Sequence, residues 1–286
     1  MKFILLFSFL TVFVHAKTMF WEINGTHGGK VYLLGSMHVG AEEMYPLDPY
    51  INEAFEKSNY LFVEVKQNEK TIMTMNKALF QRGRYESNET IANHIAPETY
   101  TQMQEWLKTY QMPIDSLDQY KPWVAALNLS MFELMQLGFS PMYGIDKYFE
   151  SKAKHMSKQI YSLEGVSEQI GVLMFDENDY QENFLKMVMS SKKASKSDMD
   201  ILIDAYKEGN VSYFEQEVLA PINSYPKIKE LLLTNRNVKM LEKIKRYINS
   251  KKGRKYFIVV GLAHLIGEEG LVEMIRASDY NVTRYE

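Results

Sequence analysis

The chain has 286 residues, 46% of them hydrophobic, and a formal net charge of −3. This length can bury a sizeable core in one large domain, and the near-neutral charge without a basic stripe argues against a nucleic-acid partner. The sequence contains no cysteine, which excludes disulfides, thiolate metal ligands and a cysteine nucleophile. Any metal ion must therefore be held by histidine and carboxylate side chains.

Residues 1–16 are expected to be a signal peptide. Lys2 supplies the positive charge, Phe3–Val14 is mostly apolar, and Val14-His15-Ala16 fits the small-residue pattern of a cleavage site. The apolar run is too short for an ordinary membrane span. We expect cleavage after Ala16 and a secreted or periplasmic domain of residues 17–286 with no stable membrane span. An uncleaved anchor is the competing interpretation.

The segments nearest the amino terminus predict strands. Met19–Ile23 and Lys30–Leu34 flank a glycine-rich turn, which is typical of a β-hairpin. Asp48-Pro49 predicts the start of a helix that runs to about Ser58, with Asp as the cap and Pro in the first turn. Tyr60–Val65 then reads as a buried strand with one acid, Glu64, inside it.

The middle of the chain, from Lys70 to about Gly138, has a helical pattern, and strands return near the carboxyl end. The sequence therefore predicts an α/β fold. Its mixed central β-sheet is built from the N- and C-terminal parts and flanked by helices, and a helical insertion at about residues 70–138 covers the site. The clearest later elements are helices at Pro97–Tyr110, Pro122–Leu137, 144–156, Asn237–Ile248 and Glu269–Ala277, strands at Gln159–Leu163 and Tyr256–Val260, and an edge strand within Tyr280–Tyr285.

Two short segments at opposite ends of the chain are near-copies. Gly35-Ser36-Met37-His38 follows one predicted strand, and Gly261-Leu262-Ala263-His264 follows another. A glycine after a strand lets the backbone approach a ligand closely, and open α/β sheets place ligand-binding groups just beyond strand ends. Histidine binds metals and shuttles protons near neutral pH. The pair predicts one site assembled from both ends.

Five charged residues are candidates to join the two histidines. A carboxylate such as Glu64 amid apolar residues costs several kcal/mol unless it is paired or bound to metal. Asp146 and Glu164 stand at helix starts, where an acid is also favoured for structural reasons, so both interpretations remain open. Arg236 is a candidate to orient a carboxylate or to stabilise an oxyanion. Glu43, close behind the first motif, is a candidate general base.

Two histidines and a carboxylate are a common ligand set for catalytic zinc and also suit manganese or iron. Here the set is His38, His264 and Glu64, and it would leave room for a water of lowered pKa. The sequence lacks a helical His-Glu-x-x-His motif, a Gly-x-Ser-x-Gly elbow and a phosphate-binding loop. Serine-hydrolase and nucleotide-driven chemistry therefore have no motif support.

Several motifs in order resemble the TraB/PrgY/GumN family, which includes the Tiki proteins. They are the two Gly-x-x-His segments, the strand acid Glu64, Tyr143-Gly144-Ile145-Asp146, Ser162-Leu163-Glu164 with Gln169, and Asn235-Arg236-Asn237. Lys121-Pro122-Trp123 is similar to the GumN-type bacterial members, so a GumN-type secreted member is the expected subtype. The resemblance covers Phe20 to Tyr285.

The resemblance implies a metal-dependent, peptidase-like hydrolase of α/β fold. Tiki members are membrane-associated metalloproteases that trim the N-terminus of Wnt ligands and use manganese or cobalt. The wider superfamily includes erythromycin esterases and haem-binding ChaN-like proteins. His38 and His264 match the paired motif histidines, Glu64 matches the acid, and Asp146, Glu164 and Arg236 match the other polar positions.

The favoured hypothesis is a secreted or periplasmic metallohydrolase that cuts a peptide or protein substrate. His38, Glu64 and His264 would hold a divalent ion (Zn, Mn or Co), Glu43 or Glu164 would take a proton, and Arg236 would stabilise the oxyanion, with Asp146 as a further catalytic residue. One alternative is a metal-free, esterase-type hydrolase with His38 as general base. The other is a non-catalytic protein that binds a peptide or haem. The oligomeric state is left open.

Overall fold

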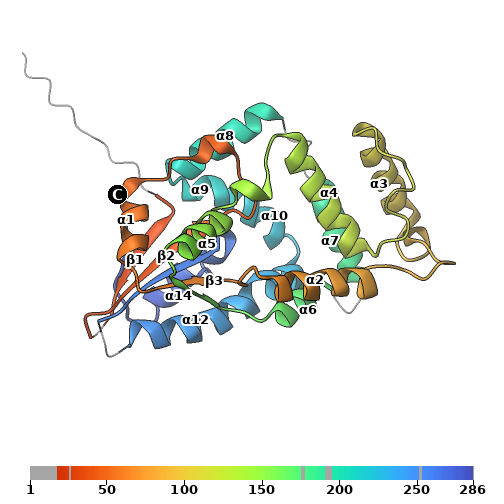
Figure 1. Ribbon diagram of the computed structural model, residues 1–286. Helices are drawn as coiled ribbons and strands as arrows, with labels where there is room; N and C mark the ends of the chain where they lie inside the picture. The colour runs from red at the N-terminus through yellow and green to blue at the C-terminus, as the bar shows by residue number, and fades with distance from the viewer. Residues whose placement is uncertain (1–17, 26, 175–177, 191–194, 251–252, 286) are drawn as a thin grey trace, which may run out of the picture.

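A six-stranded mixed β-sheet forms the centre of the computed structural model (Figure 1). The structure describes residues 18–25, 27–174, 178–190, 195–250 and 253–285, so the predicted signal peptide lies outside the described residues. Within these ranges, no helix combines the length and the apolar character that crossing a membrane requires.

The sheet is built from the two ends of the chain, as the sequence predicts. Its order is β4-β3-β5-β2-β1-β6. Strands β4, β3, β5 and β2 run parallel to one another, and β1 pairs antiparallel with both β2 and β6. The strands are β1 (Phe20–Asn24), β2 (Lys30–Ser36), β3 (Tyr60–Val63), β4 (Gln159–Ser162), β5 (Lys255–Gly261) and β6 (Val282–Arg284).

Alternating side chains of β5 show how helices cover both faces of the sheet. Tyr256 points to one face, where its ring centroid lies 5.0 Å from that of Tyr247 in α12 (Asn235–Ile248). Phe257 points to the other face, 4.8 Å from Phe149 of α5 (Ile145–His155) and 5.3 Å from Phe55 of α1 (Pro49–Lys57). Because side chains of a strand alternate with period two, the apolar run of β5 buries residues on both faces.

The helical region extends well beyond residue 138 and contains a second apolar core. Met103, Leu107, Trp123, Leu129 and Leu185 are buried in it. Figure 1 places its helices α3, α4 and α7 away from the sheet. The helices between β3 and β5, besides α5 and α12, are α2 (Glu69–Arg82), α3 (Pro97–Thr109), α4 (Pro122–Gln136), α6 (Val166–Met174), α7 (Asn178–Ser190), α8 (Lys196–Lys207), α9 (Val211–Phe214), α10 (Ala220–Asn223) and α11 (Pro226–Lys229).

Several shorter elements complete the fold. Two π-helical segments, η4 (Glu215–Leu219) and η5 (Glu230–Thr234), lie in the helical region. One short turn, η1 (Glu42–Met44), follows the first motif; the others are η2 (Ile91–Asn93) and η3 (Pro141–Tyr143). Short helices α13 (Leu262–Leu265) and α14 (Leu271–Arg276) follow β5.

The parallel strands bring the two motifs to the same edge of the sheet. Ser36 at the end of β2 pairs in register with Gly261 at the end of β5, and Val63 at the end of β3 pairs with Val259. Residues that follow these strands therefore emerge together at the carboxyl edge, the usual place for a site in such a sheet.

Candidate functional site

Glu64 lies at the centre of this edge. Strand β3 ends at Val63, so Glu64 is the first residue after the strand rather than a residue within it. It is only 5% exposed. Its Oε1 accepts the backbone N–H of Gly261 at 2.6 Å, and its Oε2 accepts Nη2 of Arg236 at 2.6 Å. These two charge-assisted bonds offset the cost of burying the carboxylate.

Arg236 joins two buried carboxylates. Besides Glu64, its Nη2 bonds Oε2 of Glu164 at 2.6 Å, and its Nε bonds Oε1 of Glu164 at 2.9 Å. Its Nη1 donates to the carbonyl of Leu232 at 3.1 Å. That carbonyl belongs to the π-helix η5, a wide-turn geometry that is frequent at functional sites. The side chain is 13% exposed, so Arg236 is not a solvated surface residue.

The two motif histidines face the two oxygens of Glu64. Nε2 of His38 lies 3.9 Å from Oε1, and Nε2 of His264 lies 3.9 Å from Oε2. Nδ1 of His38 is turned away, 3.3 Å from Oδ1 of Asp146, and that oxygen also accepts Oγ of Ser36 at 2.9 Å. Asp146, in the first turn of α5, thus orients His38.

Glycine at position 144 allows the approach of α5 to the first motif. A Cβ at Gly144 would lie 2.4 Å from the carbonyl oxygen of His38, which is closer than any real contact. The absence of a side chain therefore lets the start of α5 sit against the loop that carries His38 and brings Asp146 within reach.

Asn237 orients the second histidine. It is 1% exposed, and its Oδ1 accepts the Nδ1–H of His264 at 2.7 Å, while its Nδ2 donates to the backbone carbonyl of Glu269 at 2.9 Å. The carbonyl partner fixes which amide atom is the donor, so Nδ1 of His264 must carry the proton. Nε2 of His264 is then unprotonated and lies 3.9 Å from Oε2 of Glu64.

The histidines differ in their protonation. Burial opposes the charged form of His38, but the hydrogen bond to Asp146 and the negative charge of Glu64 raise its pKa to about 9. The ring is 59% exposed, so solvent also helps to keep that charge. Burial, with the positive charge of Arg236, lowers the pKa of His264 to about 4 against the attraction of Glu64. Such opposed shifts separate acid and base roles within a pair.

Because Gly261 has no side chain, a small open space, called the cradle below, remains between Glu64, His38 and His264. A Cβ there would lie 3.1 Å from Oε1 of Glu64, 3.7 Å from Cδ2 of His264 and 4.0 Å from Nε2 of His38. The cradle opens into a cavity of about 440 Å³, whose polar lining residues are Ser36, His38, Glu64, Gln169, Arg236 and His264. Across the described part of the chain, however, no three histidine or carboxylate side chains are already gathered closely enough to hold a metal ion.

Two predicted site residues take other places. Glu43 lies in the exposed turn η1 and is not among the residues that line the cavity. Glu164 is buried behind Arg236 and does not line the cavity either. His38, Glu64 and Arg236 do line it, as does His264, and Asp146 lies directly behind His38.

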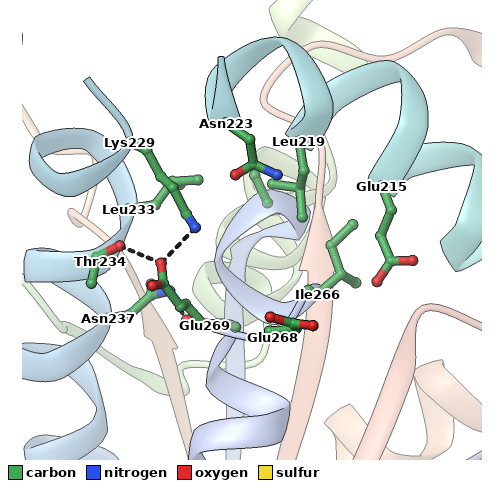
Figure 2. Close-up of a pocket in the computed structure, with 13 residues that line it drawn as sticks. Glu215, Leu219, Asn223, Lys229, Leu233, Thr234, Asn237, Ile266, Glu268 and Glu269 are labelled. Carbon is green, nitrogen blue, oxygen red and sulfur yellow. Dashed lines mark hydrogen bonds and ion pairs between the residues drawn. The ribbon is translucent and has the colours of Figure 1, made fainter. Parts of the chain in front are cut away.

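The acids after the second motif face a separate cavity of about 350 Å³, which Figure 2 shows. Oε2 of Glu269 accepts Nζ of Lys229 at 2.7 Å and Oγ1 of Thr234 at 2.9 Å. These contacts attach the segment after the motif to α11 and η5. They also hold in place the Glu269 carbonyl that fixes the Asn237 amide.

Sequence reasoning gave Asn237 no role, although a signal was present. Asn237 stands 3, 4, 7 and 11 positions before Met240, Leu241, Ile244 and Ile248, all of them buried residues of α12. A polar residue on the buried face of a helix requires a partner. The helical period therefore marks Asn237 as a residue that binds another polar group in the interior.

We expect Asn237→Ala to lower activity, or affinity for any metal held by His264, by about 10–100-fold, the usual effect of losing a group that orients a histidine. Nitrogen NMR of the imidazole should show a mixture of His264 tautomers in place of the Nδ1–H form. Asn235→Ala, in the same helix and exposed, is the matched control. An unchanged tautomer in Asn237→Ala would contradict this role.

Comparison with known proteins places the chain in a family. YbaP of Escherichia coli (strain K12) is 21% identical over 248 residues, which cover 86% of this chain and 87% of YbaP; a Shigella flexneri YbaP aligns equally. An uncharacterized protein of Treponema pallidum (strain Nichols) is 22% identical over 181 residues, covering 63% of this chain and only 53% of its own length.

No solved structure matches the chain. The model of the TraB/PrgY/gumN family matches residues 19–284, which include both Gly-x-x-His motifs and every residue of the site. A match over nearly all the described residues makes this chain a member of the TraB/PrgY/gumN family.

Proposed function

We propose that the protein is a metal-dependent hydrolase, with a peptide or protein as its substrate. The observation that carries the proposal is the cradle over Gly261, where a carboxylate oxygen of Glu64, Nε2 of His38 and the imidazole edge of His264 surround a space that a single Cβ would fill. Two donors that share an ion at bonds of about 2.0–2.2 Å lie at most about 4.4 Å apart. Both 3.9 Å nitrogen–oxygen distances satisfy that limit.

His38, Glu64 and His264 would hold the ion, with zinc, manganese and cobalt as the candidates. The orientation of both histidines through Nδ1, one by a carboxylate and one by an amide oxygen, is the arrangement that metal-binding histidines usually have. A divalent ion bound there would supply Lewis-acid activation of water and of the substrate carbonyl.

The protein's own groups would bind and stabilise the reacting parts of the substrate. Arg236 is positively charged and lines the cavity, so it would stabilise negative charge that develops on the carbonyl oxygen. Glu164 would hold Arg236 in position. Neither Glu164 nor Glu43 lines the cavity, and the proposal gives neither of them the proton-accepting role that the sequence suggested.

A metal-free hydrolase is the second candidate, and the contacts of Glu64 favour it. Both oxygens of Glu64 already accept hydrogen bonds, one from Gly261 and one from Arg236. In this reaction Nε2 of neutral His264 would take a proton from the attacking water, and protonated His38 would donate one to the leaving group. The role of His38 would then be that of an acid rather than the predicted base.

We also propose an extracytoplasmic location and the GumN-type subtype. The support is the leader pattern of residues 1–16 and the Lys121-Pro122-Trp123 start of α4. With a net charge of −3 and no basic stripe, a nucleic-acid partner is not part of the proposal.

Alanine variants of the two motif histidines test the proposed function. We expect the purified protein to contain about one divalent ion per chain and to cleave blocked peptides, and His38→Ala or His264→Ala to lower both metal content and cleavage, the latter by about 100-fold or more. His27→Ala, an exposed turn residue, is the control. Metal content would be measured by plasma mass spectrometry and cleavage by liquid chromatography.

Chelation separates the two candidates. Loss of cleavage on chelation, with recovery on addition of zinc, manganese or cobalt, supports the metal-dependent reaction. Full cleavage by the chelated protein, still abolished by His264→Ala, supports the metal-free reaction. Equal cleavage by the wild-type protein and both histidine variants would contradict a hydrolase built on this pair.

A further inference from the structure

We propose that the cavity beside Glu64 binds a bulky apolar side chain of the substrate, of the size of leucine or phenylalanine, next to the bond that is cut. This inference rests on the proposed hydrolase function and adds a substrate preference to it. It follows from the residues that form the cavity wall, which come from helices far apart in the sequence.

The wall opposite the polar groups is apolar and is assembled from several separate helices of the middle region. Leu127 comes from α4, Val172 from α6 and Leu202 from α8, while Phe214 and Val218 come from α9 and η4. Leu262 and Ile266, on either side of His264, add the part next to the second motif. These helices thus enclose a space at the carboxyl edge of the sheet.

Neighbouring side chains of the protein do not fully cover the apolar wall. Leu127, Val172, Leu202 and Val218 are each only half-buried, although they lie within the fold. The cavity of about 440 Å³ falls within the range of about 300–1,000 Å³ that is usual for small-ligand sites. A large apolar side chain would cover this surface and gain the free energy of its own removal from water.

The distribution of charge in the cavity determines which substrate side chains it can bind. The charged and titratable groups that line the cavity are His38, Glu64, Arg236 and His264, and they all lie at the sheet end. Gln169 of α6 also lines the cavity, and its side-chain amide is uncharged. A substrate carboxylate or ammonium placed against the apolar wall would therefore lose its hydration without gaining an opposite charge. A reacting carbonyl, by contrast, would lie at the polar end when an apolar side chain fills the wall.

Blocked peptides that differ in one residue test this inference. A set of dansylated, acetyl- and amide-blocked hexapeptides would carry leucine, phenylalanine, alanine, aspartate or lysine at the variable position. We expect kcat/KM for leucine and phenylalanine to exceed that for alanine by about 10-fold or more, and aspartate and lysine to be poorer still. Anisotropy of the same peptides with chelated protein measures binding without turnover.

Val218→Trp and Leu202→Trp each fill the cavity from a different helix, so one remains informative if the other does not fold. We expect either variant to remove the preference for leucine over alanine. Met73→Trp is the control, because Met73 is 71% exposed on α2 and does not line the cavity.

The two readouts distinguish the possible failures. Tighter binding of leucine and phenylalanine peptides, abolished by Val218→Trp but with no peptide cleaved, would support the apolar site and overturn the hydrolase proposal. Cleavage with equal kcat/KM for leucine, alanine and lysine peptides would overturn this inference and leave the hydrolase intact. A leucine preference that persists in both folded tryptophan variants would also overturn it.

Discussion

Arg236→Met is expected to lower the free energy of unfolding by about 3–5 kcal/mol, the usual cost of removing one partner from a buried ion pair. The guanidinium contacts Glu64 and Glu164, whose side chains are 5% and 4% exposed. Without it, two buried carboxylates would face each other with no cation between them. Urea unfolding followed by circular dichroism measures the loss, and Arg246→Met, an exposed position of the same helix, should change stability by less than about 0.5 kcal/mol.

The loss of stability in Arg236→Met should depend on pH. Burial opposes ionisation of Glu64, but the positive charges of His264 (which is protonated only in acid), His38 and Arg236 lower its pKa to about 2, below its ordinary value of 4.5. A lowered pKa stabilises the fold above pH 4.5 and loses this contribution as the pH falls toward 2. In Arg236→Met, the effect of burial on Glu64 is less well opposed, so the pKa of Glu64 becomes higher than in the wild-type protein. In chelated protein, the stability difference should therefore be largest near neutral pH and shrink below pH 4.5.

A triple variant tests whether the stability lost in Arg236→Met arises from the unpaired carboxylates. Arg236→Met with Glu64→Gln and Glu164→Gln removes the charges together, and replacing a whole buried ion cluster is often nearly neutral. We expect the triple variant to recover most of the stability lost in Arg236→Met. A triple variant as unstable as the single one would show that Arg236 stabilises the fold by packing rather than through these carboxylates.

The sheet was predictable because it depends on local sequence patterns. For the same reason, the meeting of the site residues at its carboxyl edge was predictable. The apolar runs of β2 and β5 specify buried strands, and parallel strands necessarily deliver their following residues to one edge. His38, Glu64 and His264 therefore meet as the sequence suggested. The contact of Arg236 with Glu164 was not predictable, since it depends on how η5 and α12 dock beside β4.

The two Gly-x-x-His motifs are nearly identical in sequence, but they have different structural roles. A Cβ on Gly35 would lie 2.6 Å from Cδ1 of Leu262, so this glycine serves core packing, whereas Gly261 borders the site. His38 is 59% exposed and His264 5%. Sequence similarity could not reveal this difference, because it depends on tertiary contacts such as that of Asn237 in α12 with His264.

The apolar cavity wall could not be predicted from the sequence, for a related reason. Leu127, Leu202 and Val218 read as ordinary core positions of amphipathic helices, and nothing in their spacing tells which faces stay partly open. The π-helical turns of η4 and η5 depend on tertiary packing and have no signal in the sequence. A helical cover was predicted, but its direct contribution to the cavity was not.

Gly261→Ala is expected to lower activity by about 100-fold or more while the protein stays folded. The added methyl would stand 3.1 Å from Oε1 of Glu64, between the two imidazoles, and would displace whatever the cradle binds. Misplacing reacting groups by about 1 Å can cost about 100-fold. The backbone of Gly261 has φ −51° and ψ 134°, which alanine adopts without strain. The loss should therefore appear in kcat/KM and metal content, with urea unfolding changed by only about 1 kcal/mol.

Gly35→Ala is the matched comparison, since it alters the equivalent glycine of the other motif. Its methyl would meet the side chain of Leu262 in the core, at 2.6 Å, instead of the site. Overpacking of this kind typically costs about 1–3 kcal/mol, so Gly35→Ala should lower stability more than Gly261→Ala does. Gly261→Ala with wild-type activity and metal content would mean that the space between His38, Glu64 and His264 is not where the chemistry occurs.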